Sequence, residues 1–265
     1  MKKYILMAVA GMLALSSCSN GDDEPVAQDA PRQMTFTAAY NDGASTRATL
    51  GFYNEVSFEA DDAISILSAN NTNTKFTTSA GGVTATFTGT ATADTKFYGV
   101  HPYTAGLTLD SSTGVISGIN IPIDQSPAAT SACGWDPSAP IAYATTEGTD
   151  LKFHNACALL KVTQDRDGDA FIQFWVTNGR MTGNFNLDTT TNGSLIPQTG
   201  SQYYVSAYNV PKGKTIYIAI AAGTLDHLYA NCLIDNNYQI NKSGFVTFEA
   251  GKIYDMGKTS EWPDL

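Results

Sequence analysis

Large apolar side chains at every second position recur along this chain and restrict it to a fold built from strands. The pattern is clearest in residues 34–40, 83–87 and 216–220. A period of two places these side chains on one face of a half-buried strand. No long segment has the period of an amphipathic helix, and residues 155–162 fit either a short helical turn or a buried strand. Many short strands at this spacing are typical of β-sandwiches, so we predict an all-β protein with two sandwiches in tandem.

Two turn signals divide the second half of the chain. Asn178-Gly179 separates the apolar segments 171–176 and 181–187, and both residue types tolerate a positive φ. We therefore predict a hairpin that turns at these two residues. Asn192-Gly193 predicts another turn.

A charged segment that contains glycine, residues 164–170, separates two sets of predicted strands. Such composition is typical of linkers and turns. We therefore predict an N-terminal sandwich over residues 34–165 and a C-terminal one over residues 166–265.

The first residues have the pattern of an export signal. Two lysines precede an apolar stretch from Tyr4 to Leu15, which is too short to span a bilayer. The sequence Leu15-Ser16-Ser17-Cys18 resembles the bacterial lipobox, in which a peptidase cuts before the cysteine and the thiol carries lipid such as palmitate. We therefore predict a lipoprotein signal peptide over residues 1–17 and lipidation at Cys18. The alternative is an ordinary signal peptide followed by an incidental cysteine.

Residues 18–33 are polar and acidic, with almost no large apolar side chains. They bury too little surface to offset the entropy of ordering, so we predict a flexible acidic tether. The run Gly21-Asp22-Asp23-Glu24 resembles a signal for export to the outer face of an outer membrane; a generic linker is the alternative. The prediction is a lipid anchor in the outer membrane and display at the cell surface.

The composition excludes some classes of partner. The formal net charge is −10, and a surface that binds nucleic acid needs clustered lysine and arginine, so we expect no nucleic-acid partner. Charged residues make up only 15% of the chain, below the roughly 25% of an average soluble domain. Threonine, serine, asparagine and glycine replace them, as in surface adhesins and pilins.

The chain shows no motif for catalysis, metal binding or a cofactor. Its three histidines, His101, His154 and His227, are scattered and share no motif, and no CxxC pair suggests zinc. We therefore predict a protein that is not an enzyme and that needs neither a metal nor a cofactor. Besides Cys18 the cysteines are Cys133, Cys157 and Cys232, an odd number that favours three buried thiols over one disulfide and a free thiol.

Aromatic residues are the remaining candidates for binding. Exposed rings could stack on sugars, whereas in β-proteins such residues more often fill the core or pair across strands. The candidates are Trp135, Trp175, Tyr203, Tyr204 and Tyr208.

Several segments, in order, resemble the fimbrillin family, the lipoprotein subunits of protease-assembled, type V-like pili of Gram-negative anaerobes. Each segment is short, but together they cover nearly all of the chain after Cys18. They are residues 34–38 (MTFTA), 44–48 (ASTRA), 56–66 (VSFEADDAISI), 97–103 (FYGVHPY), 121–125 (IPIDQ), 151–159 (LKFHNACAL) and 248–254 (FEAGKIY). The chain departs from the family at Phe58, where a tryptophan is common, and in its short C-terminal tail.

This resemblance implies two transthyretin-like, Greek-key sandwiches that assemble by strand exchange. An Arg-specific protease removes an N-terminal strand, and a strand of a neighbouring subunit fills the groove. Between Lys3 and Lys75 the only basic residues are Arg32 and Arg47. A cut after Arg32 leaves the strand 34–40 in place, whereas a cut after Arg47 removes it. We therefore favour Arg47 over Arg32 as the maturation site; the alternative is a loop arginine that is not cut in the cell.

The sequence thus predicts a surface lipoprotein that acts as a fimbrial subunit or an accessory or tip adhesin. Its expected partners are other fimbrial subunits, an Arg-specific protease, the outer membrane through its lipid, and a host protein or glycan. The alternative is a glycan-binding surface lipoprotein of a nutrient-uptake system. Exposed aromatic rings on one face of a sandwich would favour that alternative.

Overall fold

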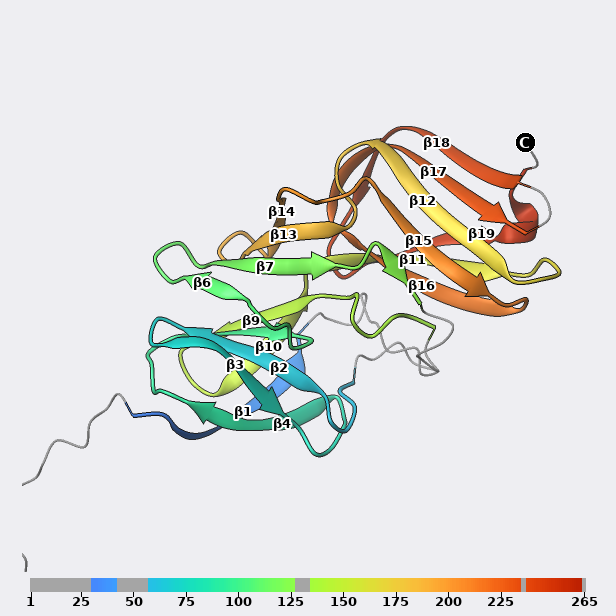
Figure 1. Ribbon diagram of the computed structural model, residues 1–265. Coiled ribbons are helices and arrows are strands. Elements are labelled where there is room, and N and C mark those ends of the chain that lie inside the picture. Colours follow the sequence, from blue (N-terminus) through green and yellow to red (C-terminus); the bar gives the residue numbers. More distant parts are fainter. Residues whose placement is uncertain (1–29, 42–56, 127–133, 235–236, 264–265) are drawn as a thin grey trace, which may run out of the picture.

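The described part of the protein has its strands arranged in one barrel and three open sheets (Figure 1). The structure is a computed structural model and describes residues 30–41, 57–126, 134–234 and 237–263. Cys18, Arg47 and Cys133 lie outside these ranges. In the part that is described, no helix is long and apolar enough to cross a membrane.

The first sheet closes into a barrel, with the strand order β1-β10-β9-β5-β2-β3-β4. Its strands are β1 (Arg32–Tyr40), β2 (Ala63–Ser68), β3 (Asn71–Thr77), β4 (Thr84–Ala91), β5 (Phe97–His101), β9 (Ala142–Thr146) and β10 (Asp150–Asn155). Closure depends on β1, which pairs antiparallel with β4 on one side and parallel with β10 on the other. A closed barrel leaves no unpaired edge.

The remaining described strands form three sheets stacked as layers. The four-stranded sheet has the order β14-β13-β7-β6 and contains β6 (Thr108–Asp110), β7 (Val115–Ile121), β13 (Gly183–Asp188) and β14 (Ser194–Pro197). The three-stranded sheet has the order β16-β11-β19 and contains β11 (Cys157–Gln164), β16 (Lys214–Ala221) and β19 (Ile253–Lys258). The five-stranded sheet has the order β18-β17-β12-β15-β8 and contains β8 (Asp124–Gln125), β12 (Ala170–Asn178), β15 (Tyr204–Val210), β17 (Gly223–Leu233) and β18 (Asn237–Phe248). A 3-10 turn, η1 (Thr259–Glu261), follows β19.

The three-stranded sheet is apolar on both faces and lies as the middle layer between the five-stranded and four-stranded sheets. On β16, Ile216, Ile218 and Ile220 belong to the core shared with the five-stranded sheet. Tyr217 and Ala219, which alternate with them, belong to the core shared with the four-stranded sheet and the barrel. A strand that is buried on both faces reads as a continuous apolar run, as it does here. A third core fills the barrel.

The prediction of an all-β protein with sandwich-like packing is confirmed, since open sheets pack face to face across the shared cores. Residues 155–162, for which a helical turn was the alternative, belong mostly to the buried strand β11. The predicted turn at Asn192-Gly193 is also confirmed: both residues have positive φ, and the turn joins β13 to β14.

The predicted hairpin across Asn178-Gly179 is wrong. Gly179 has a φ of +109°, but Asn178 keeps a negative φ, so the expected two-residue turn does not form. Both sides of β12 are occupied, by β15 and by β17. The chain therefore passes into another sheet, where β13 pairs with β7 and β14.

Strand pairing crosses the predicted domain boundary at residue 165. β11 precedes that boundary, yet it pairs with β16 and β19, which follow it. β7 and β8 also pair with strands from the second half. The division into two tandem domains stays a prediction. The predicted tether overlaps the fold by two residues, because β1 begins at Arg32 and its pairing with β4 extends to that residue.

Candidate functional site

The strand β1 is the first candidate site, because the proposed assembly requires its removal. Its pairing with β4 runs from Arg32 opposite Ala91 to Ala39 opposite Thr84. Its pairing with β10 runs from Thr37 opposite Asp150 to Tyr40 opposite Phe153. Removing β1 would expose the backbone hydrogen-bonding groups of both neighbours.

The side chains of β1 alternate between the barrel core and its outer surface. Phe36 and Ala38 are fully buried, as the period of two predicted. The Phe36 ring contacts Phe76 and Phe97 edge to face, at centroid distances of 5.3 and 5.1 Å. Without β1, the barrel would therefore have an apolar groove with a pocket shaped for an aromatic side chain.

The last residue of β1 is attached to the barrel by a polar contact. The hydroxyl of Tyr40 lies 2.9 Å from Nδ1 of His101, at the end of β5. Nε2 of His101 lies 3.7 Å from the carboxylate of Asp62. The Asp62 pKa is lowered: burial opposes the shift, but hydrogen bonds from His101 and the Glu59 backbone and the His101 charge outweigh it. These contacts give His101 a structural role, because they hold the C-terminal end of β1 on the barrel.

The two arginines proposed as cleavage sites differ in what the structure describes. Arg32 is exposed and is the first residue of β1. Arg47 and the lipidation candidate Cys18 lie outside the described residues, so both stay predictions.

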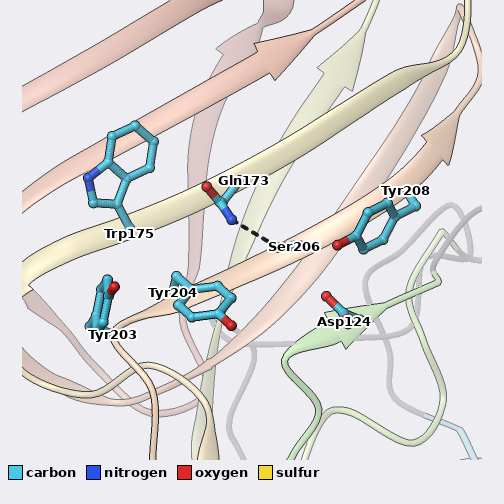
Figure 2. A pocket seen from close by; sticks show the side chains of 7 residues that line it. All are labelled: Asp124, Gln173, Trp175, Tyr203, Tyr204, Ser206 and Tyr208. Carbon is cyan, nitrogen blue, oxygen red and sulfur yellow. Dashed lines mark hydrogen bonds between the residues drawn. The ribbon is translucent and has the colours of Figure 1, made fainter.

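Four of the five aromatic candidates gather in one pocket on the outer face of the five-stranded sheet (Figure 2). β12 supplies Trp175, β15 supplies Tyr204 and Tyr208, and Tyr203 precedes β15. The fifth candidate, Trp135, packs against the core between the middle layer and the four-stranded sheet.

The pocket also contains polar residues that sequence reasoning did not single out. They are Asp124 on β8, Gln173 on β12 and Ser206 on β15. Gln173 lies two residues from Trp175, so the period of two along β12 is a signal that both share a face. Nothing in the sequence signals that β8 and β15 lie next to each other. The pocket has a volume of about 540 Å³, within the ~300–1,000 Å³ typical of small-molecule sites.

The histidines and cysteines that the structure describes are distributed over several strands. His101, His154 and His227 lie on β5, β10 and β17. Among the described residues, no group of three or more His, Cys, Asp or Glu could hold a metal ion. Cys157 and Cys232 are free, buried thiols, as predicted. Burial raises the pKa of Cys157 to about 12, so this thiol stays protonated near neutral pH.

Comparisons with known proteins identify solved structures that share this fold. No protein-family model matches the chain, and no curated protein sequence matches it. Two solved structures, each named a "putative cell adhesion protein", share its fold. One, from Bacteroides uniformis, has a TM-score of 0.54 and 17% identity, over 85% of this chain and 92% of that chain. The other, from Bacteroides ovatus, has a TM-score of 0.53 and 12% identity, over 88% of this chain and 96% of that chain. At this level of identity the likeness establishes a shared fold.

Proposed function

We propose that this protein is a surface-exposed adhesion lipoprotein that acts as a fimbrial subunit or as an accessory or tip subunit. Cys18 carries the lipid that anchors it in the outer membrane. A cut after Arg47 releases β1, and a strand from a neighbouring subunit replaces it. The fold shared with proteins named for cell adhesion supports the surface role.

The observation that carries the assembly proposal is the position of β1. It is the strand that closes the barrel, and it fills the groove between β4 and β10 with Phe36 and Ala38. A replacement strand would recover the same backbone hydrogen bonds and fill the same side-chain positions. β1 also lies at the N-terminal end of the described fold, so a single cut beyond residue 41 severs it from the rest of the chain.

The proposal is tested by treating the purified full-length protein with an Arg-specific protease and following its size. We expect a cut after Arg47, followed by oligomers seen by size-exclusion chromatography with light scattering. The Arg47→Gln variant should stay monomeric under the same treatment. The Arg32→Gln variant is the matched control and should assemble like the unaltered chain.

A synthetic peptide with the sequence of β1, residues 32–40, tests the groove directly. Added in excess during cleavage, it should occupy the groove and suppress the oligomers. The same peptide with Phe36→Asp should not, because a carboxylate would be buried in an apolar pocket. Protein that is cut after Arg47 but stays monomeric, with no effect of either peptide, would contradict strand exchange.

The alternative function, a glycan-binding surface lipoprotein of a nutrient-uptake system, is favoured by a different observation, the aromatic pocket on the five-stranded sheet.

A further inference from the structure

We propose that the pocket on the outer face of the five-stranded sheet binds a neutral oligosaccharide. The pocket is lined by Asp124, Gln173, Trp175, Tyr203, Tyr204, Ser206 and Tyr208. It is built from β12, β15 and β8, whereas the strand-exchange groove belongs to the barrel. The inference therefore does not rest on assembly by strand exchange.

The exposed aromatic rings that line this pocket are not part of the hydrophobic core of the sheet. Tyr203 is 50% exposed and Tyr208 is 47% exposed, whereas the core of the same sheet is made of Ile172, Phe174 and their neighbours on the opposite face. The C–H faces of a sugar ring pack on aromatic rings of this kind while the sugar hydroxyls remain at the edges. Half-exposed tyrosines on a strand face thus suit a ligand that is apolar on its faces and polar at its rim.

The rings are held in position by their neighbours. Trp175 stacks on Tyr229 with a centroid distance of 5.2 Å and an interplanar angle of 10°. Tyr203 meets Tyr204 edge to face at 5.4 Å, and Tyr208 packs against Phe171 at 4.8 Å. Rings that are already ordered lose little conformational entropy when a ligand binds.

Polar groups lie between the aromatic ends of the pocket (Figure 2). Nε2 of Gln173 donates to Oγ of Ser206 at 3.3 Å, across the paired strands β12 and β15. Carboxylate, amide and hydroxyl groups together offer both acceptors and donors, which is the set that sugar hydroxyls need. A purely apolar ligand would cover the remaining donors and acceptors of these groups without pairing them.

Asp124 is held at the rim by its neighbour in the chain. The side chain of Gln125 is fully buried and forms two hydrogen bonds with the backbone of Ala219, one from Nε2 at 2.8 Å and one to Oε1 at 2.9 Å. β8 also pairs with β15, which places Asp124 opposite Ser206. The exposed Asp124 carboxylate is thereby presented to the pocket from a fixed backbone.

The charge of the site selects among saccharides. Among the described residues that line the pocket, Asp124 alone has an acidic or basic side chain, and the whole chain has a formal charge of −10. Both disfavour ligands that carry sulfate, sialic acid or uronic acid. The observations therefore point to a neutral oligosaccharide.

The test is calorimetric titration of the full-length protein with a panel of neutral hexasaccharides: maltohexaose, cellohexaose, laminarihexaose, mannohexaose and xylohexaose. Hyaluronan hexasaccharide and sialyllactose serve as acidic comparators. We expect saturable binding of at least one neutral compound and weaker binding of both acidic ones. Tyr203→Ala and Tyr208→Ala should each weaken that binding about tenfold, because each removes an exposed ring.

The matched control is Phe245→Ala, which removes an aromatic ring that is 76% exposed on β18, at the opposite edge of the sheet. It should bind like the unaltered protein, and thermal unfolding checks that all variants are folded. Asp124→Asn removes the carboxylate that lines the pocket and should narrow the difference in binding between the neutral and the acidic compounds. Failure of every neutral compound to bind, or binding that survives both tyrosine substitutions, would overturn the proposal. So would binding restricted to the acidic saccharides.

Discussion

The hydroxyl of Tyr40 lies 2.9 Å from Nδ1 of His101 and so joins the last residue of β1 to the last residue of β5. These strands are not neighbours in the barrel. The contact therefore holds the C-terminal end of β1 independently of its backbone pairing with β4 and β10. That end adjoins the segment that contains Arg47.

We predict that Tyr40→Phe loosens β1 without unfolding the barrel. Loss of this hydrogen bond should cost about 1 kcal/mol, or roughly a fivefold increase in opening. Hydrogen exchange resolved along the chain should show faster exchange in β1. Tyr103→Phe is the matched control, because Tyr103 contacts Lys75 through its ring. Equal exchange in β1 of both variants would show that the contact contributes nothing.

Phe36 should contribute more to stability than any polar contact of β1. It is fully buried and contacts Phe76 and Phe97, so Phe36→Ala should lower the free energy of unfolding by about 3–5 kcal/mol. Thr35 is exposed on the same strand, and Thr35→Ala should change it by less than about 0.5 kcal/mol. Urea denaturation measures both. A similar decrease in the free energy of unfolding for the two variants would contradict the burial of Phe36 in the barrel core.

The strand β1 also shows how far sequence reasoning reaches. Its period of two predicted the strand and the burial of Phe36 and Ala38, because side-chain alternation is a local property. Its partners are set by contacts far away in the sequence: it pairs in parallel with β10, more than a hundred residues later. Closure of the barrel was therefore not predictable from the local pattern.

For the aromatic pocket, too, the sequence predicted the local features but not the distant contacts. Trp175, Tyr203, Tyr204 and Tyr208 could be named from composition alone. Their meeting depends on the pairing of β12 with β15, and the predicted hairpin had instead joined β12 to the segment that forms β13. Turn chemistry permits a hairpin at Asn178-Gly179, but it does not specify which strand occupies the edge.

The two described thiols should be unreactive in the folded protein. Both Cys157 and Cys232 are buried, and burial raises the pKa of each. At about pH 8, near the usual thiol pKa of ~8.5, iodoacetamide should leave both unmodified until denaturant is added. Peptide mass spectrometry before and after unfolding gives the readout. Rapid labelling of Cys157 in the native protein would contradict its burial.

A side chain at Gly193 should destabilise the protein more than one at an open glycine turn. Gly193 has a φ of +71°, and an added Cβ would collide with the ring of Tyr143 on β9 of the barrel. Gly213 also has a positive φ, +81°, but a Cβ there meets nothing within 4 Å. Gly213→Ala should cost about 1 kcal/mol of strain, and Gly193→Ala about 1–3 kcal/mol more, since the ring must move. Equal losses in urea denaturation would argue against close packing of this turn on the barrel.

The segment predicted as a linker, residues 164–170, is tied to the C-terminal turn η1. Oδ1 of Asp165 accepts a hydrogen bond from the backbone N–H of Ser260 at 2.8 Å, and Oδ2 accepts one from Oγ of Ser260 at 2.6 Å. Nε of Arg166 donates to the carbonyl of Thr259 at 2.9 Å. The charges that suggested a solvated linker thus stabilise a contact between distant parts of the chain.

Asp165 should therefore make stability depend on pH in the acidic range. The pKa of Asp165 is lowered overall. Burial acts to raise it, but hydrogen bonds from Ser260 and Thr259 and the charge of Lys258 outweigh that effect. A carboxylate whose pKa is lowered by folding stabilises the folded state at pH values above its unfolded pKa of about 3.9. This stabilisation is lost as the pH falls through the pKa of the folded state.

Asp165→Asn should accordingly lower the free energy of unfolding at neutral pH, and its difference from the unaltered protein should shrink below about pH 4. Urea denaturation at a series of pH values measures this convergence. Asp169→Asn, an exposed position in the same turn, is the matched control and should follow the unaltered protein throughout. A difference for Asp165→Asn that stays constant across the acidic range would assign its effect to packing, because only an ionising group makes the difference vary with pH.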